Sequence, residues 1–257
     1  MAYSKNILPT RVSVLDDMID AGGLERGSTV LVSGGCGTGK TLLTLESLYK
    51  ASLQGEKSVF LTCSEDPEKI RQRASNFGWD VEKQEAEDKF FMAKIDPFKL
   101  AVDVANVLRE YNLRETGVKD IKKRVQCWVP LIDNKDYKIP FTPDRIALDS
   151  VSALKAAISR QEEYRICVQT LIEALNQHES SNILISESQQ DPHTHQQEGI
   201  VEYLVDGVIL LYTIRKGQLR RNALEIIKLR HSNHLREMVP YMITNKGIKI
   251  LKGEKIL

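Results

Sequence analysis

Eight consecutive residues, Gly34 to Thr41, have the types and spacing to hold phosphate groups. They match the pattern G-x-x-x-x-G-K-[ST] at every fixed position, with further glycines inside it. The glycines let backbone N–H groups turn inward around phosphate oxygens, and a helix starting at the end of the loop adds partial positive charge. We therefore expect a nucleotide to be bound by Gly35, Cys36, Gly37, Thr38, Gly39, Lys40 and Thr41.

Lys40 and Thr41 have the most specific roles in such a loop. The Lys40 ammonium would reach the β- and γ-phosphates, where it would also act in catalysis, and the Thr41 hydroxyl would ligate Mg²⁺. The cofactors that this chemistry predicts are ATP and Mg²⁺.

Two acids follow predicted strands downstream of the loop. Asp149 ends the mostly apolar run 145–149, as does the acid that holds Mg²⁺ through water in phosphate-loop NTPases. It could instead cap the helix that follows. Glu65 comes just after the run 58–62 and would polarise the attacking water if that strand lies near the phosphate-loop strand. Its alternative role is a first-turn acid that stabilises a helix dipole.

The elements that would position these residues alternate between strands and helices. Asp66 before Pro67 predicts a helix start, because proline is favoured at the first helical position. Strands are predicted over 28–33, 58–62, 90–93, 145–149 and 182–186, and helices over 15–20, from 41, 66–77, 99–111 and 162–178. The tail predicts β-structure over 207–214, 223–230 and 248–251. The fold class is therefore α/β, a mostly parallel sheet with helices on both faces and a C-terminal β-rich extension.

Length and composition predict one domain over residues 1–257. The chain is 42% hydrophobic and 28% charged, typical of a soluble globule, and its four cysteines form no C-x-x-C pair. No apolar run approaches the roughly 20 residues of a membrane helix, and the first residues lack the apolar core of a signal peptide. We therefore expect a cytoplasmic protein without a membrane partner.

One interruption separates a predicted helix from the strand that ends in Asp149. Residues 113–143 are polar and contain Trp128 and three prolines. Connections from helix to strand lie at the amino-terminal edge of a parallel sheet, so this insertion should lie away from the nucleotide. It is either a solvated excursion or a docking loop for a protein partner, anchored by Trp128.

Charge is distributed unevenly along the chain. Residues 215–257 hold eleven Lys/Arg against three Asp/Glu, a net of +8, so the remaining residues carry −7. This division suits head-to-tail contacts between copies of the chain, or a surface for nucleic acid. The charge distribution alone leaves both possibilities open.

Several motifs together resemble the KaiC/RadA branch of RecA-type ATPases, in a single-domain form such as the archaeal KaiC-domain proteins. The resemblance covers nearly the whole chain apart from 113–143. It is carried by the phosphate loop together with Leu15-Asp16, Gly22-Gly23-Leu24, Ser64-Glu65-Asp66-Pro67, Asn76-Phe77-Gly78-Trp79, Leu148-Asp149-Ser150, Asp206-Gly207-Val208-Ile209, and Leu224 to Arg230 with His234.

The resemblance implies a RecA-like core and a ring, usually a hexamer, with ATP at the subunit interfaces. It also implies that Lys228, Arg230 and His234 reach the neighbour's γ-phosphate, where cations stabilise transition-state charge. The alternative is a basic edge strand that discourages aggregation. One departure bears on activity: such domains usually carry two glutamates after the second strand, and here Ser64 replaces the first.

These observations predict an ATP-binding protein, a slow Mg²⁺-dependent ATPase that assembles head-to-tail and serves regulation or signalling. Two alternatives stay open at this point. One is a DNA-binding RadA-like accessory of recombination or repair, in which the basic tail holds phosphates. It is not favoured, because the resemblance implies that the polar loop 188–199 corresponds to the DNA-contacting loop of RecA-type recombinases, and here that loop contains no lysine or arginine to neutralise phosphates. The other is a scaffold gated by ATP without hydrolysis, which Ser64 favours and whose insertion recruits a partner.

Overall fold

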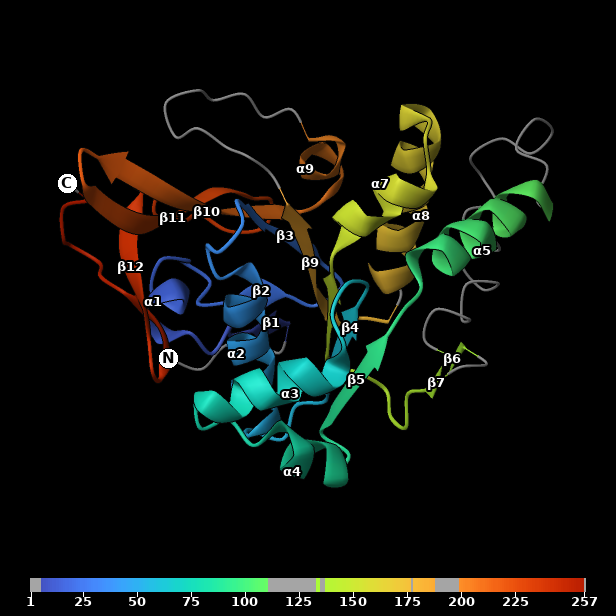
Figure 1. Ribbon diagram of the computed structural model, residues 1–257, viewed down its shortest axis with the longest axis horizontal. Coiled ribbons are helices and arrows are strands. Elements are labelled where there is room, and N and C mark those ends of the chain that lie inside the picture. The colour runs from blue at the N-terminus through green and yellow to red at the C-terminus, as the bar shows by residue number, and fades with distance from the viewer. Residues whose placement is uncertain (1–5, 111–132, 135–136, 177, 188–198, 257) are drawn as a thin grey trace.

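The structure is a computed structural model, and it describes residues 6–110, 133–134, 137–176, 178–187 and 199–256. Its main feature is a nine-stranded sheet in the order β13-β12-β11-β10-β3-β9-β8-β4-β5 (Figure 1). These strands are β3 (Thr29–Gly34), β4 (Ser58–Thr62), β5 (Phe90–Lys94), β8 (Arg145–Asp149), β9 (Ser181–Glu187), β10 (Gly207–Lys216), β11 (Leu219–Leu229), β12 (Val239–Thr244) and β13 (Gly247–Ile250). Two short pairs lie outside it: β1 (Ile7–Leu8) with β2 (Leu24–Glu25), and β6 (Asp133–Asn134) with β7 (Tyr137–Lys138).

Burial explains why the central strands read as continuous apolar runs. Strands β10, β3, β9, β8, β4 and β5 pair in parallel, each with the next. All six residues of β3 and all five of β4 are buried. Helices cover both faces of this parallel sheet, so side chains on either face are removed from water. The parallel α/β core predicted from the sequence is confirmed.

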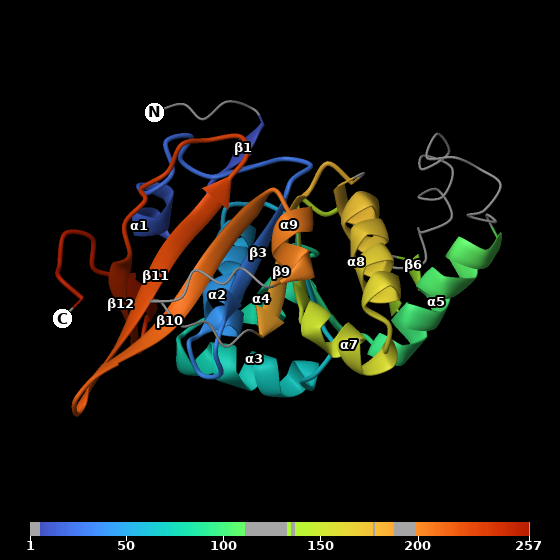
Figure 2. The same cartoon turned by 90° about the horizontal axis from the view of Figure 1, so that it is seen from above.

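Helices cover the sheet in two layers with separate apolar cores. One layer packs α1, α2, α3 and α4 against one face, and the other packs α5, α7, α8 and α9 against the opposite face (Figures 1 and 2). The helices are α1 (Ser13–Asp16), α2 (Lys40–Ser52), α3 (Pro67–Asn76), α4 (Val81–Ala86), α5 (Pro97–Glu110), α7 (Leu154–Ala157), α8 (Gln161–Asn176) and α9 (Ile200–Leu204), with a 3-10 turn, η3, at Val151–Ala153. Within the described residues, no helix is both long enough and apolar enough to cross a membrane.

Local sequence signals located the central elements well and the short ones poorly. Strands β4 and β8 have the predicted bounds, and Asp66 caps α3 by accepting a hydrogen bond from the Glu68 amide. The helix predicted over 15–20 is wrong: α1 covers Ser13–Asp16. Strand β12 and helices α4 and α9 were not predicted. The insertion predicted at 113–143 lies mostly outside the described residues.

The C-terminal extension is antiparallel and returns to the core. Strand β11 pairs with β10, β12 with β11, and β13 with β12, all antiparallel. The hairpin of β12 and β13 packs on α2, where the Ile248 amide donates to buried Glu46 at 2.7 Å. The long ribbon of β10 and β11 and the helix α5 lie at opposite ends of the molecule (Figure 2). The β-rich extension predicted from the tail is therefore confirmed.

A buried ion pair ties the amino-terminal segment to the sheet. Arg145, at the start of β8, is 1% exposed, and its guanidinium donates to Glu56 Oε2 at 2.7 Å and to the Pro9 carbonyl at 2.6 Å. Glu56 also accepts from Arg11. A buried charge is tolerated only when it is paired and hydrogen-bonded, and Glu56 supplies the ion pair that offsets the desolvation of Arg145.

Removing the charge of Glu56 should therefore destabilise the fold strongly. We expect Glu56→Gln to lower the free energy of unfolding by about 3 kcal/mol, because it leaves a buried guanidinium without its counter-ion. The measurement is denaturant unfolding followed by circular dichroism. The matched control is Glu163→Gln, which removes the exposed ion pair with Arg160 and should cost less than about 0.5 kcal/mol. Equal losses of unfolding free energy in the two variants would contradict the role of Glu56 as the counter-ion that stabilises buried Arg145.

Candidate nucleotide-binding site

The phosphate loop joins the carboxyl end of β3 to the start of α2. Gly39 precedes the helix with a φ of +91°, a conformation that side chains rarely adopt, and a Cβ there would lie 3.1 Å from Ile243 Cδ1. Gly34 allows a second close approach, since a Cβ would lie 2.2 Å from the Leu211 carbonyl oxygen. Packing against β10 and β12 therefore favours glycine at Gly34 and Gly39, independently of any phosphate.

Lys40 and Thr38 close the loop on itself. The Lys40 ammonium donates to the carbonyls of Gly34 and Gly35, both at 2.9 Å, and Thr38 Oγ1 also donates to Gly35 at 2.9 Å. Burial lowers the pKa of Lys40, and the charges of Glu187 and Asp149 oppose that change. The ammonium thus points into the loop, where phosphate oxygens would replace the two carbonyls.

Asp149 contacts the loop directly, although its strand is not next to β3. The Thr41 hydroxyl donates to Asp149 Oδ2 at 2.6 Å. Asp149 is not a helix cap, because Ser150 occupies the cap position of η3, so that alternative reading is wrong. Burial raises the pKa of Asp149; its hydrogen bond from Thr41 and the charge of Lys40 oppose the rise, while the charges of Glu65 and Glu187 add to it.

These two oxygen ligands fit a magnesium ion. Mg²⁺ prefers one or two protein oxygens together with phosphates and waters, and a hydroxyl beside a carboxylate supplies that set. Among the described residues, no group of three His, Cys, Asp or Glu could hold a metal by itself. A metal at this edge would therefore depend on the nucleotide for the rest of its ligands.

Glu65 lies next to Asp149 rather than next to the phosphate-loop strand. The catalytic role of Glu65 was predicted on the condition that its strand, β4, lies near the phosphate-loop strand, β3. Strands β8 and β9 separate the two, so β4 and β3 are not neighbours in the sheet. The charge of Glu65 nevertheless contributes to the raised pKa of Asp149. The Glu65 carboxylate pairs with Arg73 at 2.6 Å, and both side chains are about two-fifths exposed. Glu65 precedes the cap of α3 and is not in its first turn, where the acid is Glu68.

Sequence reasoning missed two residues of this site. Glu187 ends β9 opposite Gly34 and acts on the pKa of Lys40. The same signal that marked Asp149, an acid at the end of a predicted strand, could have found it. Tyr241 lies on β12, and its hydroxyl donates to the Thr38 carbonyl of the loop. No local pattern identifies that contact, because the two residues are 203 positions apart.

Two of the three predicted trans residues, Lys228 and Arg230, lie toward the opposite edge of the sheet from the loop. Arg230 N donates to the Asp206 carbonyl and Asp206 N to the Thr29 carbonyl, so Arg230 is level with the first residue of β3. Thr29 and Gly34 are five residues apart, or ~16 Å along a strand. Lys228 pairs with Val208, and His234 forms a β-bridge with Ile19. Lys228 and Arg230 therefore lie away from the phosphate loop of their own chain.

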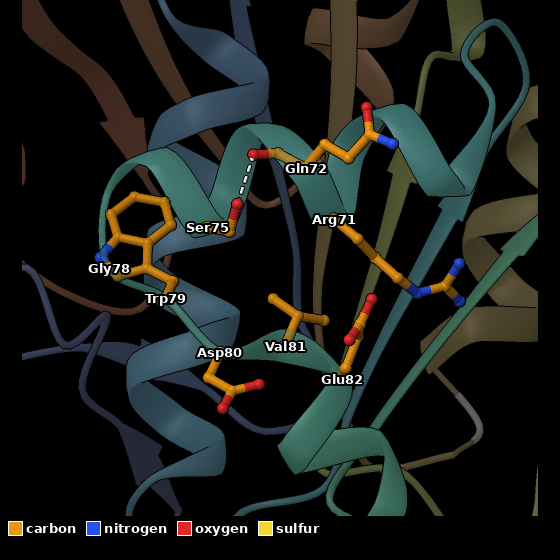
Figure 3. A pocket seen from close by; sticks show the side chains of 8 residues that line it. All are labelled: Arg71, Gln72, Ser75, Gly78, Trp79, Asp80, Val81 and Glu82. Atoms are coloured by element: carbon orange, nitrogen blue, oxygen red, sulfur yellow. Dashed lines mark hydrogen bonds between the residues drawn. The ribbon is translucent and has the colours of Figure 1, made fainter.

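A hollow of about 450 Å³ lies between α3 and α4, and no residue of the phosphate loop lines it (Figure 3). Arg71 and Trp79 line it, as do Asp80 and Ser75. Its polar groups are engaged with the protein: Arg71 pairs with Glu85 at 2.7 Å, and Asp80 caps α4 by accepting from the Lys83 amide at 3.0 Å. This hollow is a consequence of how the two helices meet.

Fold and site together define the class of protein. A glycine loop at the carboxyl end of a central parallel strand, with its threonine bonded to an acid two strands away, is the arrangement of a RecA-like P-loop NTPase core.

The comparisons with known proteins give the family. A family model described as the KaiC ATPase matches residues 8–255, so the chain belongs to the KaiC family of ATPases. The circadian clock oscillator protein KaiC of Acaryochloris marina is 30% identical over 248 residues, 94% of this chain and 43% of that protein. KaiC of Synechococcus elongatus is 31% identical with the same coverage. The chain therefore spans less than half the length of these curated relatives.

A solved structure supports the fold over the full length of a similar chain. The crystal structure of a KaiC-like protein from the hyperthermophilic archaeon Pyrococcus horikoshii superposes with a TM-score of 0.70 at 26% identity. The match covers 95% of this chain and 98% of that one. The RecA-like fold and the family resemblance predicted from the motifs are confirmed.

The contact between Tyr241 and the loop yields a test of loop rigidity. We expect Tyr241→Phe to lower the free energy of unfolding by about 1 kcal/mol, because the Thr38 carbonyl loses its hydrogen-bond donor. Hydrogen exchange of the loop amides should accelerate in the same variant. Tyr203→Phe is the control, since that ring is 66% exposed and should leave both readouts unchanged. Unaltered exchange in Tyr241→Phe would show that the hairpin does not restrain the loop.

Proposed function

We propose that this protein binds ATP with Mg²⁺, hydrolyses it slowly, and assembles head-to-tail into a ring, a hexamer, with ATP at the subunit interfaces. The observation that carries the proposal is the 2.6 Å contact between Thr41 and Asp149, beside an inward-pointing Lys40. It brings a hydroxyl, a carboxylate and an ammonium to one edge, the set that nucleotide phosphates and Mg²⁺ require. The proposed role is regulatory, as a single-domain ATPase.

Each loop group has a distinct task in this proposal. Backbone amides from Gly35 to Gly39 and the amino end of α2 bind phosphate oxygens, and Cys36 contributes its amide to the same set. Lys40 exchanges its two carbonyl partners for phosphate oxygens. Thr41 and Asp149 would hold Mg²⁺, Asp149 through water, and the ion when bound offsets charge on the phosphates.

Glu65 is the residue proposed to orient and deprotonate the attacking water. It lies beside Asp149 on the carboxyl edge, and its exposed carboxylate can exchange Arg73 for water at little cost, because exposed ion pairs contribute about 0–1 kcal/mol. Ser64 stands where KaiC-like domains usually carry a glutamate, which leaves a single carboxylate for this task. Slow turnover follows from that loss.

The trans arrangement accounts for Lys228, Arg230 and His234. Because the register puts Lys228 and Arg230 toward the edge away from their own loop, a nucleotide would meet these two cations on a neighbouring copy, and His234 follows them closely in the chain. Arg230 is about half exposed and can reach outward. A loop on one edge and cations on the other make each contact heterologous, and a heterologous contact closes into a ring when the rotation permits.

A second candidate is a scaffold that binds ATP without turnover. The pairing of Glu65 with Arg73 at 2.6 Å favours it, since a carboxylate oxygen that accepts from an arginine is occupied and not available to a water molecule. In that case ATP would hold the ring together while residues 113–143 recruit a protein partner.

Steady-state turnover separates the two candidates. We expect the wild type to hydrolyse ATP slowly with Mg²⁺ and Glu65→Gln to lose at least about a hundredfold, because general base catalysis contributes on that order. Light-scattering mass should show a ring with ATP for both proteins, since the substitution leaves phosphate binding intact. Arg73→Gln is the control for loss of the ion pair alone and should keep turnover.

Contrary results have definite meanings. A wild type that assembles with ATP but does not turn over would establish the scaffold. Turnover unchanged in Glu65→Gln would remove Glu65 as the base. A monomer under all conditions would exclude the trans roles.

The raised pKa of Asp149 predicts a pH dependence of magnesium-assisted binding. Only the charged carboxylate serves the metal, so a raised pKa means that protons compete at a higher pH than for an ordinary aspartate. As the pH is lowered from about 8 toward 5, the Mg²⁺-dependent gain in ATP affinity should shrink, by up to about tenfold per pH unit below that pKa. Calorimetry with and without Mg²⁺ measures the gain.

The control for this titration is Asp149→Asn, which cannot change charge. The nucleotide phosphates titrate equally in both proteins, so the difference between the two profiles isolates Asp149. Parallel profiles would show that Asp149 does not serve the metal.

A further inference from the structure

Asp206 binds both Arg230 and the first residue of the phosphate-loop strand through one carboxylate. It follows α9 and precedes β10. Its Oδ2 accepts from the Thr29 amide at 3.0 Å, and its Oδ1 accepts from Arg230 Nη1 at 3.3 Å. Its backbone binds the same two residues, with N donating to the Thr29 carbonyl and the carbonyl accepting from Arg230 N. Thr29 is the first residue of the strand that ends in the phosphate loop.

Two contacts restrain the Arg230 guanidinium. Besides Asp206 Oδ1, the carbonyl of Tyr203 in α9 accepts from Nη2 at 3.2 Å. An unrestrained arginine side chain samples many rotamers and loses that freedom when it is ordered. Arg230 has already lost part of its rotamer freedom within its own chain. Its side chain remains 51% exposed, so the guanidinium is held yet still open to a second anion.

Asp206 also offsets repulsion within a cluster of charges. The pKa of Lys228 is lowered first by burial and then by the charge of Arg230, while the carboxylates of Asp206 and Glu202 act in the opposite direction. Lys228 and Arg230 would both have to approach the same phosphate, and their charges repel each other unless a nearby carboxylate offsets the repulsion. Asp206 is the acid that bonds directly to one of them.

We propose that Asp206 is a positioning residue for the trans cations: it orients Arg230 toward the phosphate oxygens of the neighbour's nucleotide and fixes it to the strand that carries the subunit's own phosphate loop. This inference rests on the proposed function, in which Arg230 acts across the interface. It adds a residue that touches no nucleotide and acts only through Arg230. Its effect should therefore appear in the neighbour's site and not in its own.

Mixed rings test that direction of action. The acceptor is Arg230→Ala, which has an intact phosphate loop and Glu65 but no trans arginine. The donor is Glu65→Gln, which binds ATP and offers an intact Arg230 but lacks the base. Equal amounts are mixed without nucleotide, assembled with ATP and Mg²⁺, and the ring fraction is isolated before turnover is measured. In random heterologous rings about a quarter of the sites pair an intact Glu65 on one subunit with an intact Arg230 on its neighbour.

Asp206→Asn is then added to one partner at a time. Asparagine keeps an oxygen that can accept from Thr29 but loses the charge that holds Arg230. On the donor, we expect it to reduce the recovered turnover by about tenfold, since a displaced trans arginine forfeits part of its large contribution. On the acceptor, whose arginine is already absent, we expect turnover within about twofold of the reference mixture. Glu25→Gln on the donor is the matched control, because Glu25 pairs with the adjacent His231 at 3.1 Å.

The outcomes are distinct. Loss only with the acceptor would mean that Asp206 acts through Thr29 on its own loop, which overturns the proposal. Increased turnover with the Asp206→Asn donor would mean that Asp206 holds Arg230 away from the neighbour's nucleotide. Failure of that donor to enter rings would mean that Asp206 serves assembly. Either result overturns the proposal. Absence of recovery in the reference mixture would contradict the proposed function itself, independently of Asp206.

Discussion

The parallel pairing of β10, β3, β9 and β8 is the constraint on which the remaining structure depends. It sends every strand of the core in one direction, so the residues that follow the strands gather at the carboxyl edge and those that precede them gather at the amino edge. Gly34, Glu187 and Asp149 meet at the first edge for this reason alone. Pairing between neighbouring strands thus creates a site from residues more than a hundred positions apart.

The same constraint separates two kinds of polar chemistry. At the carboxyl edge, Lys40, Thr41 and Asp149 bond to one another or to loop carbonyls that a ligand can replace. At the amino edge, Arg145 and Glu56 form a buried pair that no ligand can replace, since the guanidinium is 1% exposed. The hydrogen bonds of the first set can be replaced by bonds to a ligand, whereas the Arg145–Glu56 ion pair remains in place. Burial decides between them, because desolvation makes an unpaired charge costly.

The C-terminal extension completes the functional edge in addition to widening the sheet. Its hairpin returns to α2 through Glu46 and to the loop through Tyr241. Its longer strand, β11, runs antiparallel and so carries Lys228 and Arg230 away from the loop toward the start of β3. One extension therefore both restrains the subunit's own loop and presents cations at the far edge. The proposed head-to-tail assembly would use both consequences.

The amino-acid sequence by itself determined the features that local chemistry specifies. The phosphate loop is a contiguous pattern, the buried strands β4 and β8 are continuous apolar runs, and Asp66 with Pro67 starts α3 by capping rules that act within one turn. The motifs that resemble KaiC-like ATPases were enough to identify the family. Short elements such as α4 and β12 escaped, because tertiary packing, and not propensity, stabilises so few residues.

Only the tertiary structure decided which distant residues meet. The sheet order puts two strands between β4 and β3, so Glu65 lies beside Asp149 and not beside the loop, and the same order brings Glu187 opposite Gly34. The bond from Tyr241 to Thr38 and the two-way contact of Asp206 depend on register between strands far apart in the chain. Local periodicity carries no information about strand order, because the free energy that selects it comes from burial of both faces of the completed sheet.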